Sequence, residues 1–183
     1  MIFVTADHHF GHANIIEYTN RLFASVEEMD AALIAAWNER VTDYDLVYHL
    51  GDFTLGGINK MLRYYRQLNG IIVLMQGNHD WRWMGEYREE KHDDIWIAPP
   101  LHTIEIDGNL VVMCHYAMRV WDRAHHGSFH IYGHSHGELP GVGRSMDVGV
   151  DTHPDYAPYT IREVLSKLMS QPVMQHHKGG EGE

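Results

Sequence analysis

The sequence predicts an α/β fold in which two β-sheets pack face to face with helices outside them. The first half of the chain alternates short apolar runs with helical patterns, which is typical of a parallel sheet. The second half contains mainly strand patterns with short links, which indicates a second sheet of more antiparallel character. The 183 residues suit one domain with one core, and we see neither an internal repeat nor an interdomain linker.

The first half combines three apolar runs with two helical patterns. Ser25 and Glu28 form a capping box, and apolar residues follow at helical spacing as far as Val41. A second amphipathic pattern over 61–68 ends at Gly70. The expected strands are residues 2–6, 46–50 and 71–75.

The second half contains five more apolar runs and one helical pattern. Asp107-Gly108 is a strong hairpin signal, because both residues tolerate positive φ. Thr160 and Glu163 form another capping box, which begins the last helix. We expect one domain over 1–172 and a flexible tail over 173–183. The expected strands are residues 95–98, 101–106, 110–114, 130–132 and 146–150.

Charge and cysteine content limit the classes of function. Fourteen basic and 25 acidic residues give a formal net charge of −11, which argues against binding of long duplex DNA or an anionic membrane. A small phosphorylated substrate stays compatible, because bound cations can reverse the local field. Cys114 is the only cysteine, and the first residues resemble neither a signal peptide nor a membrane span. We therefore expect a cytoplasmic protein.

Polar residues follow the carboxyl ends of successive predicted strands, where open α/β sheets bind ligands. The pairs Asp7/His9 and His134/His136 are each two residues apart, so an extended backbone would point both members the same way. Mixed nitrogen and oxygen ligands suit borderline divalent metals, and seven ligands suit two ions that share a carboxylate. The seven candidate ligands are Asp7, His9, Asp52, Asn78, His115, His134 and His136.

Five motifs together resemble the calcineurin-like metallophosphoesterases, in the order of that family and across residues 7 to 136. They are Asp7-x-His9, Gly51-Asp52, Gly77-Asn78-His79-Asp80, Cys114-His115 and Gly133-His134-Ser135-His136. The stretches DHHFGHANII, YHLGDF and HYAMRVWD are similar to a branch of small single-domain bacterial and phage phosphoesterases. The second and fourth motifs depart slightly from the family pattern, but neither departure removes a ligand.

The resemblance implies a four-layer αββα sandwich and a centre of two divalent metal ions. We expect manganese first, with iron, nickel, cobalt or zinc as alternatives. Asp52 would bridge the two ions. The first ion would be held by Asp7, His9 and His136, and the second by Asn78, His115 and His134.

This resemblance also implies hydrolysis of a phosphomonoester or phosphodiester, with a nucleotide-like substrate favoured. A hydroxide held between the ions would attack phosphorus in line, and His79 would protonate the leaving oxygen. Asp80 would orient the ring of His79, or else serve as a turn residue or helix cap. Asn78 would contact the substrate, and His12 would either contact the substrate phosphate or merely stabilise its loop.

The loop after His115 offers Arg119 for phosphate and Trp121 for stacking on a base, unless it is simply a packed, solvated loop. Trp81 and Trp83 would form a rim of the cleft or cover a core edge.

Other functions remain open at this level. The chain could be a nuclease acting on nucleic-acid ends, a non-catalytic binding scaffold of the same fold, or a histidine-rich metal store. The sequence leaves the substrate, the native metal and the oligomeric state undecided.

Overall fold

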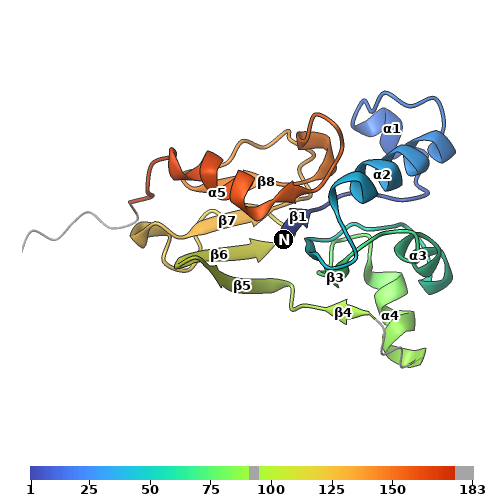
Figure 1. Ribbon diagram of the computed structural model, residues 1–183, viewed down its shortest axis with the longest axis horizontal. Helices are drawn as coiled ribbons and strands as arrows, with labels where there is room; N and C mark the ends of the chain where they lie inside the picture. The colour runs from blue at the N-terminus through green and yellow to red at the C-terminus, as the bar shows by residue number, and fades with distance from the viewer. Residues whose placement is uncertain (91–94, 176–183) are drawn as a thin grey trace, which may run out of the picture.

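The first of two β-sheets holds five strands in the order β4-β3-β2-β1-β9 (Figure 1). The computed structural model describes residues 1–90 and 95–175. All neighbours in this sheet are parallel except β1 and β9, which are antiparallel. The strands are β1 (Ile2–Thr5), β2 (Leu46–His49), β3 (Ile71–Leu74), β4 (Trp96–Ile97) and β9 (Tyr159–Thr160).

The second sheet has the order β5-β6-β7-β8, and only β5 and β6 are antiparallel. The expected antiparallel character is therefore wrong beyond the hairpin at Asp107-Gly108. Segments 115–128 and 133–144 are long enough to carry the chain back to the same end of the sheet, which makes parallel pairing possible. The strands are β5 (Leu101–Ile106), β6 (Asn109–Cys114), β7 (Phe129–Tyr132) and β8 (Ser145–Asp147).

Three of the five α-helices within the described residues agree with the sequence patterns. The Ser25 side chain accepts a hydrogen bond from Glu28 N, and Thr160 and Glu163 form a complete capping box. The sequence patterns did not predict α1, a single turn, or α4, which has Gly85 in its middle. The helices are α1 (Ile15–Tyr18), α2 (Val26–Arg40), α3 (Ile58–Tyr65), α4 (Trp81–Glu90) and α5 (Ile161–Met169), with 3₁₀ turns η1 (Ala124–His126) and η2 (Val150–Thr152).

The core confirms the α/β sandwich of two mixed sheets flanked by helices. Helices α2, α3 and α4 gather against the outer face of the first sheet, while α5 contributes to the core between the sheets (Figure 1). The outer cluster includes Phe3, Met29, Leu33, Trp37, Val47 and Ile72. The inter-sheet cluster includes Val4, Val111, Met113, Ile131, Val164 and Leu165.

The outer face of the second sheet is covered by the segment between β6 and β7. Val112 packs there with Trp121 and Ala124, and Met174 lies against the same cluster. Trp121 is buried and its indole donates to Ser128 O, so it is not free to stack on a base. Residues 176–183, most of the predicted tail, lie outside the described residues. Among the helices described, none is long and apolar enough to cross a membrane.

Candidate metal centre

The loops after β1, β2, β3 and β7 meet at one pocket at the carboxyl ends of these strands. A polar segment follows each of these strands. Side chains that are far apart in the sequence therefore meet at one site. The predicted site residues that line this pocket are His9, His12, Asp52, Asn78, His79, His134 and His136. Ile15, Tyr18 and Glu138, which had not been predicted, also line it.

Within the described residues, three overlapping groups of side chains could hold metal ions, since the ligand atoms of each group lie within 4.8 Å of one another. Asp52 Oδ2 lies 3.6 Å from His9 Nε2 and 3.5 Å from His115 Nε2, between two of the groups. Asn78 Oδ1 lies 3.0 Å from His115 Nε2. The groups are Asp7/His9/His136, Asp52/His115/His134 and His9/Asp52/His79.

Five of the seven candidate ligands have a left-handed backbone rather than the extended one that their spacing suggested. Non-glycine residues rarely adopt this conformation, although Asp, Asn and His adopt it more readily than most. The paired residues do converge, but through tight loops beyond the strand ends. The φ angles are 60° for Asp7, 52° for His9, 56° for Asp52, 68° for His134 and 47° for His136.

Hydrogen bonds join these loops directly to one another. Asp7 N donates to Gly51 O, and His9 N donates to Asp52 O, both at 3.0 Å. His134 N donates to Asp7 Oδ2 at 2.8 Å. A Cβ at Gly77 would lie 2.2 Å from Asp52 Oδ1, so this close approach requires glycine.

Asp80 is buried and its hydrogen bonds reach the backbone of these loops. Its carboxylate accepts from the N–H groups of Asp52, Phe53 and Gly77, at 2.6, 3.1 and 2.9 Å. It also accepts from the indole of the buried Trp83 at 2.8 Å. These contacts favour the interpretation of Asp80 as a turn residue, and its action on the His79 ring stays a prediction.

The buried ligand atoms have the electrostatics of a cation site. Burial, with Asp147 and Asp52 nearby, raises the pKa of Asp7, whose Oδ1 has no hydrogen-bond partner. Burial lowers the pKa of His9 to about 2, and its Nε2 also lacks a partner. Burial would raise the pKa of Asp52, but the hydrogen bond and charge of His115, the charge of His9 and the hydrogen bond from His79 N together outweigh it and lower the pKa to about 2. Unpartnered buried polar atoms of this kind fit divalent cations.

Two candidate ligand histidines are oriented by hydrogen bonds at their other ring nitrogen. His115 Nδ1 lies 2.9 Å from Leu50 O, which leaves Nε2 facing the pocket. His136 Nδ1 lies 2.6 Å from Asp151 Oδ2, and Asp151 is paired with Arg21. Burial would raise the pKa of Asp151, but hydrogen bonds from His136 and Arg21 lower it. Arg21 and Asp151 had not been predicted.

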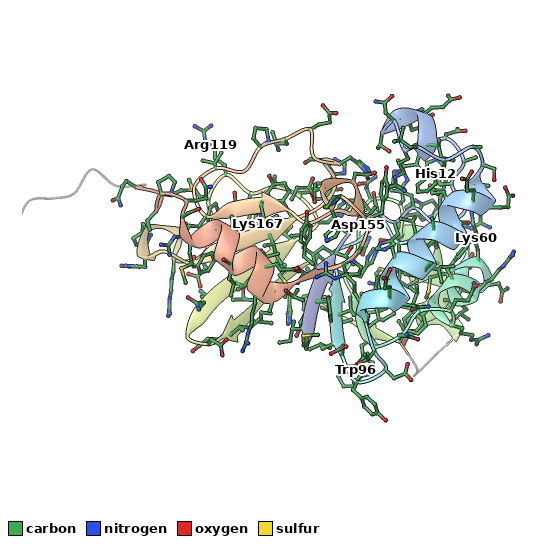
Figure 2. The ribbon with its side chains drawn as sticks, turned by 45° about the horizontal axis from the view of Figure 1, so that its top comes forward. His12, Lys60, Trp96, Arg119, Asp155 and Lys167 are labelled. Carbon is green, nitrogen blue, oxygen red and sulfur yellow. The ribbon has the colours of Figure 1, made fainter. Side chains whose placement is uncertain are left out.

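Arg119 does not reach this pocket. It is exposed and lines a separate depression with Leu139 and Val142, and Figure 2 shows it well apart from His12. Met118 N donates to His130 Nε2 at 3.0 Å, which holds the loop against the outer face of the second sheet. Arg119 does not line the pocket of the candidate ligands, so its contact with the substrate stays an untested prediction.

Comparison with known proteins gives one family and several relatives. Residues 1–148 match the calcineurin-like phosphoesterase superfamily domain. The uncharacterized protein MJ1445 of Methanocaldococcus jannaschii is 49% identical over 81 residues, covering 43% of this chain and 46% of that protein. The Gene 66 protein of Mycobacterium phage L5 is 39% identical over 79 residues, covering 42% of this chain and 38% of that protein. The chain thus matches less than half the length of either curated relative.

A solved structure is similar over nearly the whole chain. It is a protein of unknown function, AQ665, from Aquifex aeolicus. The TM-score is 0.69 at 24% identity, covering 91% of this chain and 98% of that one. This similarity supports the fold.

Proposed function

Because the chain belongs to the calcineurin-like phosphoesterase superfamily, we propose that it is a metal-dependent hydrolase of phosphoric esters that works at this pocket. One observation carries the proposal. A single carboxylate oxygen, Asp52 Oδ2, faces His9 on one side and His115 on the other at 3.6 and 3.5 Å. That arrangement suits a carboxylate shared by two cations.

We assign two divalent ions to the pocket, with Asp52 contributing to both. The unpartnered Asp7 Oδ1 and His9 Nε2 support the first position. Nitrogen and oxygen donors accept manganese, iron, nickel, cobalt or zinc, and we favour manganese. Bound there, such ions supply Lewis acidity and a water acidic enough to lose a proton near neutral pH. The first position is Asp7, His9 and His136, and the second is Asn78, His115 and His134.

His79 is the proton donor to the leaving oxygen in this proposal. Its side chain is 37% exposed at the pocket wall, with Nε2 4.0 Å from Asp52 Oδ2. Its backbone N–H donates to Asp52 Oδ1 at 2.8 Å, which fixes the position of the His79 backbone beside Asp52. Asp80 is a positioning residue, because it holds the backbone of Asp52 and Gly77 in place.

Other residues that line the pocket suggest where the substituent on the substrate's phosphate would lie. His12 and Asn78 line the pocket. Both would contact the substrate, Asn78 in addition to its place at the second metal position. Tyr18 presents a largely exposed aromatic ring to the same pocket. An aromatic ring at this place supports a planar, nucleotide-like substituent on the phosphate.

Hydrolysis of nitrophenyl and alkyl phosphate esters with added Mn²⁺ tests the proposal. Asp52→Asn should lose hydrolysis of every ester, because both ions lose their shared ligand. His79→Ala should lower kcat by about 10²–10⁴-fold for alkyl esters, and much less for nitrophenyl esters, whose leaving group needs no proton. His126→Ala, an exposed histidine on η1, is the matched control and should change neither rate.

A substrate panel sharpens the result. It should contain phosphomonoesters, linear diesters and 2′,3′- and 3′,5′-cyclic nucleotides, each assayed with Mn, Fe, Ni, Co and Zn. A wild-type protein that hydrolyses none of them with any metal would contradict the hydrolase proposal and favour a binding scaffold.

A further inference from the structure

Arg21 is a fully buried arginine in the loop between α1 and α2, and its contacts converge on the metal centre. Its side chain has no exposed surface. Nε and Nη2 donate to the two carboxylate oxygens of Asp151, at 2.7 and 2.8 Å. Nη2 also donates to Asp7 O at 2.7 Å, and Nη1 donates to His8 O at 2.9 Å. A buried guanidinium requires such complete pairing.

The two carbonyl contacts reach the loop that carries Asp7 and His9. Both residues are in the left-handed conformation, so the loop leaves the strand and its carbonyls need donors from elsewhere. Arg21 supplies those donors. On the other side of the same loop, Gly11 N donates to the Asp30 carboxylate at 2.9 Å, and Lys60 donates to Gly11 O. The loop is thus held at both ends.

The carboxylate contact reaches the third ligand of the same group. Asp151 Oδ2 accepts from Arg21 and lies 2.6 Å from His136 Nδ1. A proton on His136 Nδ1 is the arrangement that leaves Nε2 as a free lone pair for a cation. One guanidinium therefore links His136, from the loop after β7, with Asp7, from the loop after β1.

We propose that Arg21 is a positioning residue for the first metal position, coupling His136 through Asp151 to the loop of Asp7 and His9. The inference rests on the proposed metal centre. None of the contacts of Arg21 described above reaches Asn78, His115 or His134. Loss of Arg21 should accordingly weaken one of two metal positions and spare the other.

Calorimetric titration of metal-stripped protein with Mn²⁺ tests this selectivity. The wild type should bind two ions. Arg21→Ala and Asp151→Asn should each weaken one of them by about 10–100-fold and leave the other within about threefold, because a histidine that loses its hydrogen-bonded carboxylate binds a metal ion less tightly. Arg21→Lys should lie between, since one ammonium cannot keep the bidentate contact and both carbonyls.

Two further measurements identify the affected position and separate it from a loss of folding. In a His134→Gln background, which removes a ligand of the second position, adding Arg21→Ala should weaken the remaining ion by the same factor. Long-range proton–nitrogen spectra of the metal-free wild type should show His136 with its proton on Nδ1. If Arg21→Ala does not fold, Asp151→Asn, Arg21→Lys and these spectra decide the question.

Arg40→Ala is the matched control. Arg40 also pairs with a carboxylate and a histidine, Glu163 at 2.7 Å and His153 at 2.8 Å, but away from the pocket. It should leave both Mn²⁺ affinities unchanged. Failure of the wild type to bind Mn²⁺ would defeat the proposed function itself. Two positions that weaken together, or not at all, in the Arg21 and Asp151 variants would overturn only the role of Arg21.

Discussion

The two proposed metal positions share Asp52 but differ in how the protein surrounds them. At the first, Asp7 and His9 are buried, and His136 is held by Asp151. At the second, Asn78 and His134 are exposed, and only His115 is buried. The first position is therefore arranged by the fold before any ion binds, whereas the second is open to solvent and substrate.

This difference between the two positions shows where metal binding and the stability of the metal-free chain make opposite demands. A buried carboxylate without a bound cation destabilises the folded chain, because burial and two neighbouring carboxylates disfavour its charge. An exposed histidine imposes little such penalty. The first position should thus be the tighter but more costly half of the centre.

The largest effect is expected for Asp7→Asn. The variant should lose the first ion and hydrolysis with it, yet its metal-free form should be more stable by about 1–3 kcal/mol at pH 7. The reason is that Asn retains the shape of the side chain and removes a buried charge. Urea unfolding of metal-stripped protein, together with the ester assay, measures both changes.

The matched variant for this comparison is His134→Gln at the second position. It should also lose activity, but its metal-free stability should change by less than about 0.5 kcal/mol, as is usual for an exposed side chain. Equal stability changes in the Asp7 and His134 variants would show that the two positions do not differ in this way.

A fall in pH should reduce the stability of the folded metal-free chain more through the buried His9 than through the exposed His134. The pKa of His9 is lowered by burial to about 2 in the folded chain, whereas the unfolded chain binds its proton near pH 6.5. Below pH 6.5 the unfolded state therefore holds more protons, and stability falls as the pH falls. In metal-free protein, His9→Gln should remove about 1.4 kcal/mol per pH unit of this loss.

His134→Gln should remove less of the acid-induced loss, because its pKa is lowered by a shallower burial. Urea unfolding at pH 5.5 and 4.5, where the histidine of the unfolded chain is largely protonated, compares the two variants with the wild type. An unchanged pH slope in His9→Gln would contradict the assignment of His9 as a neutral buried ligand.

The smallest effect is expected for Arg119→Ala, which lies outside both positions. Arg119 belongs to a depression on the outer side of the second sheet, so kcat/KM should change by less than about twofold. A loss of tenfold or more would mean that the substrate extends from the pocket to this loop.

The sequence predicted those parts of the fold and site that depend on local patterns. The capping boxes at Ser25 and Thr160 predicted two helices correctly, and the side chains of the five motifs lie close together in the groups that could hold metal ions. Strand direction in the second sheet depends on long connections, which carry no local signal for direction. The spacing of Asp7 and His9 was interpreted as extended, whereas their loops are left-handed.

The supporting residues were hidden for a different reason. Arg21 and Asp151 are 130 positions apart, and neither belongs to a motif with the ligands. Their role is visible only once the fold places them together. Arg119 is the opposite case. It lies close to the candidate ligand His115 in the sequence and its side chain suits phosphate, but it lines a different depression in the structure.

The left-handed backbone at the ligand positions bears on protein engineering. Copying these side chains onto regular strands or helices of another scaffold would aim them in different directions, because their geometry comes from loops with φ between 47° and 68°. A successful graft would have to include the loops, a glycine at the position of Gly77 that lets the backbone approach Asp52, and the Asp80 carboxylate that accepts from the Asp52 N–H group. The loops and the side chains would therefore have to be transferred together, because the backbone of the loops sets the directions of the side chains.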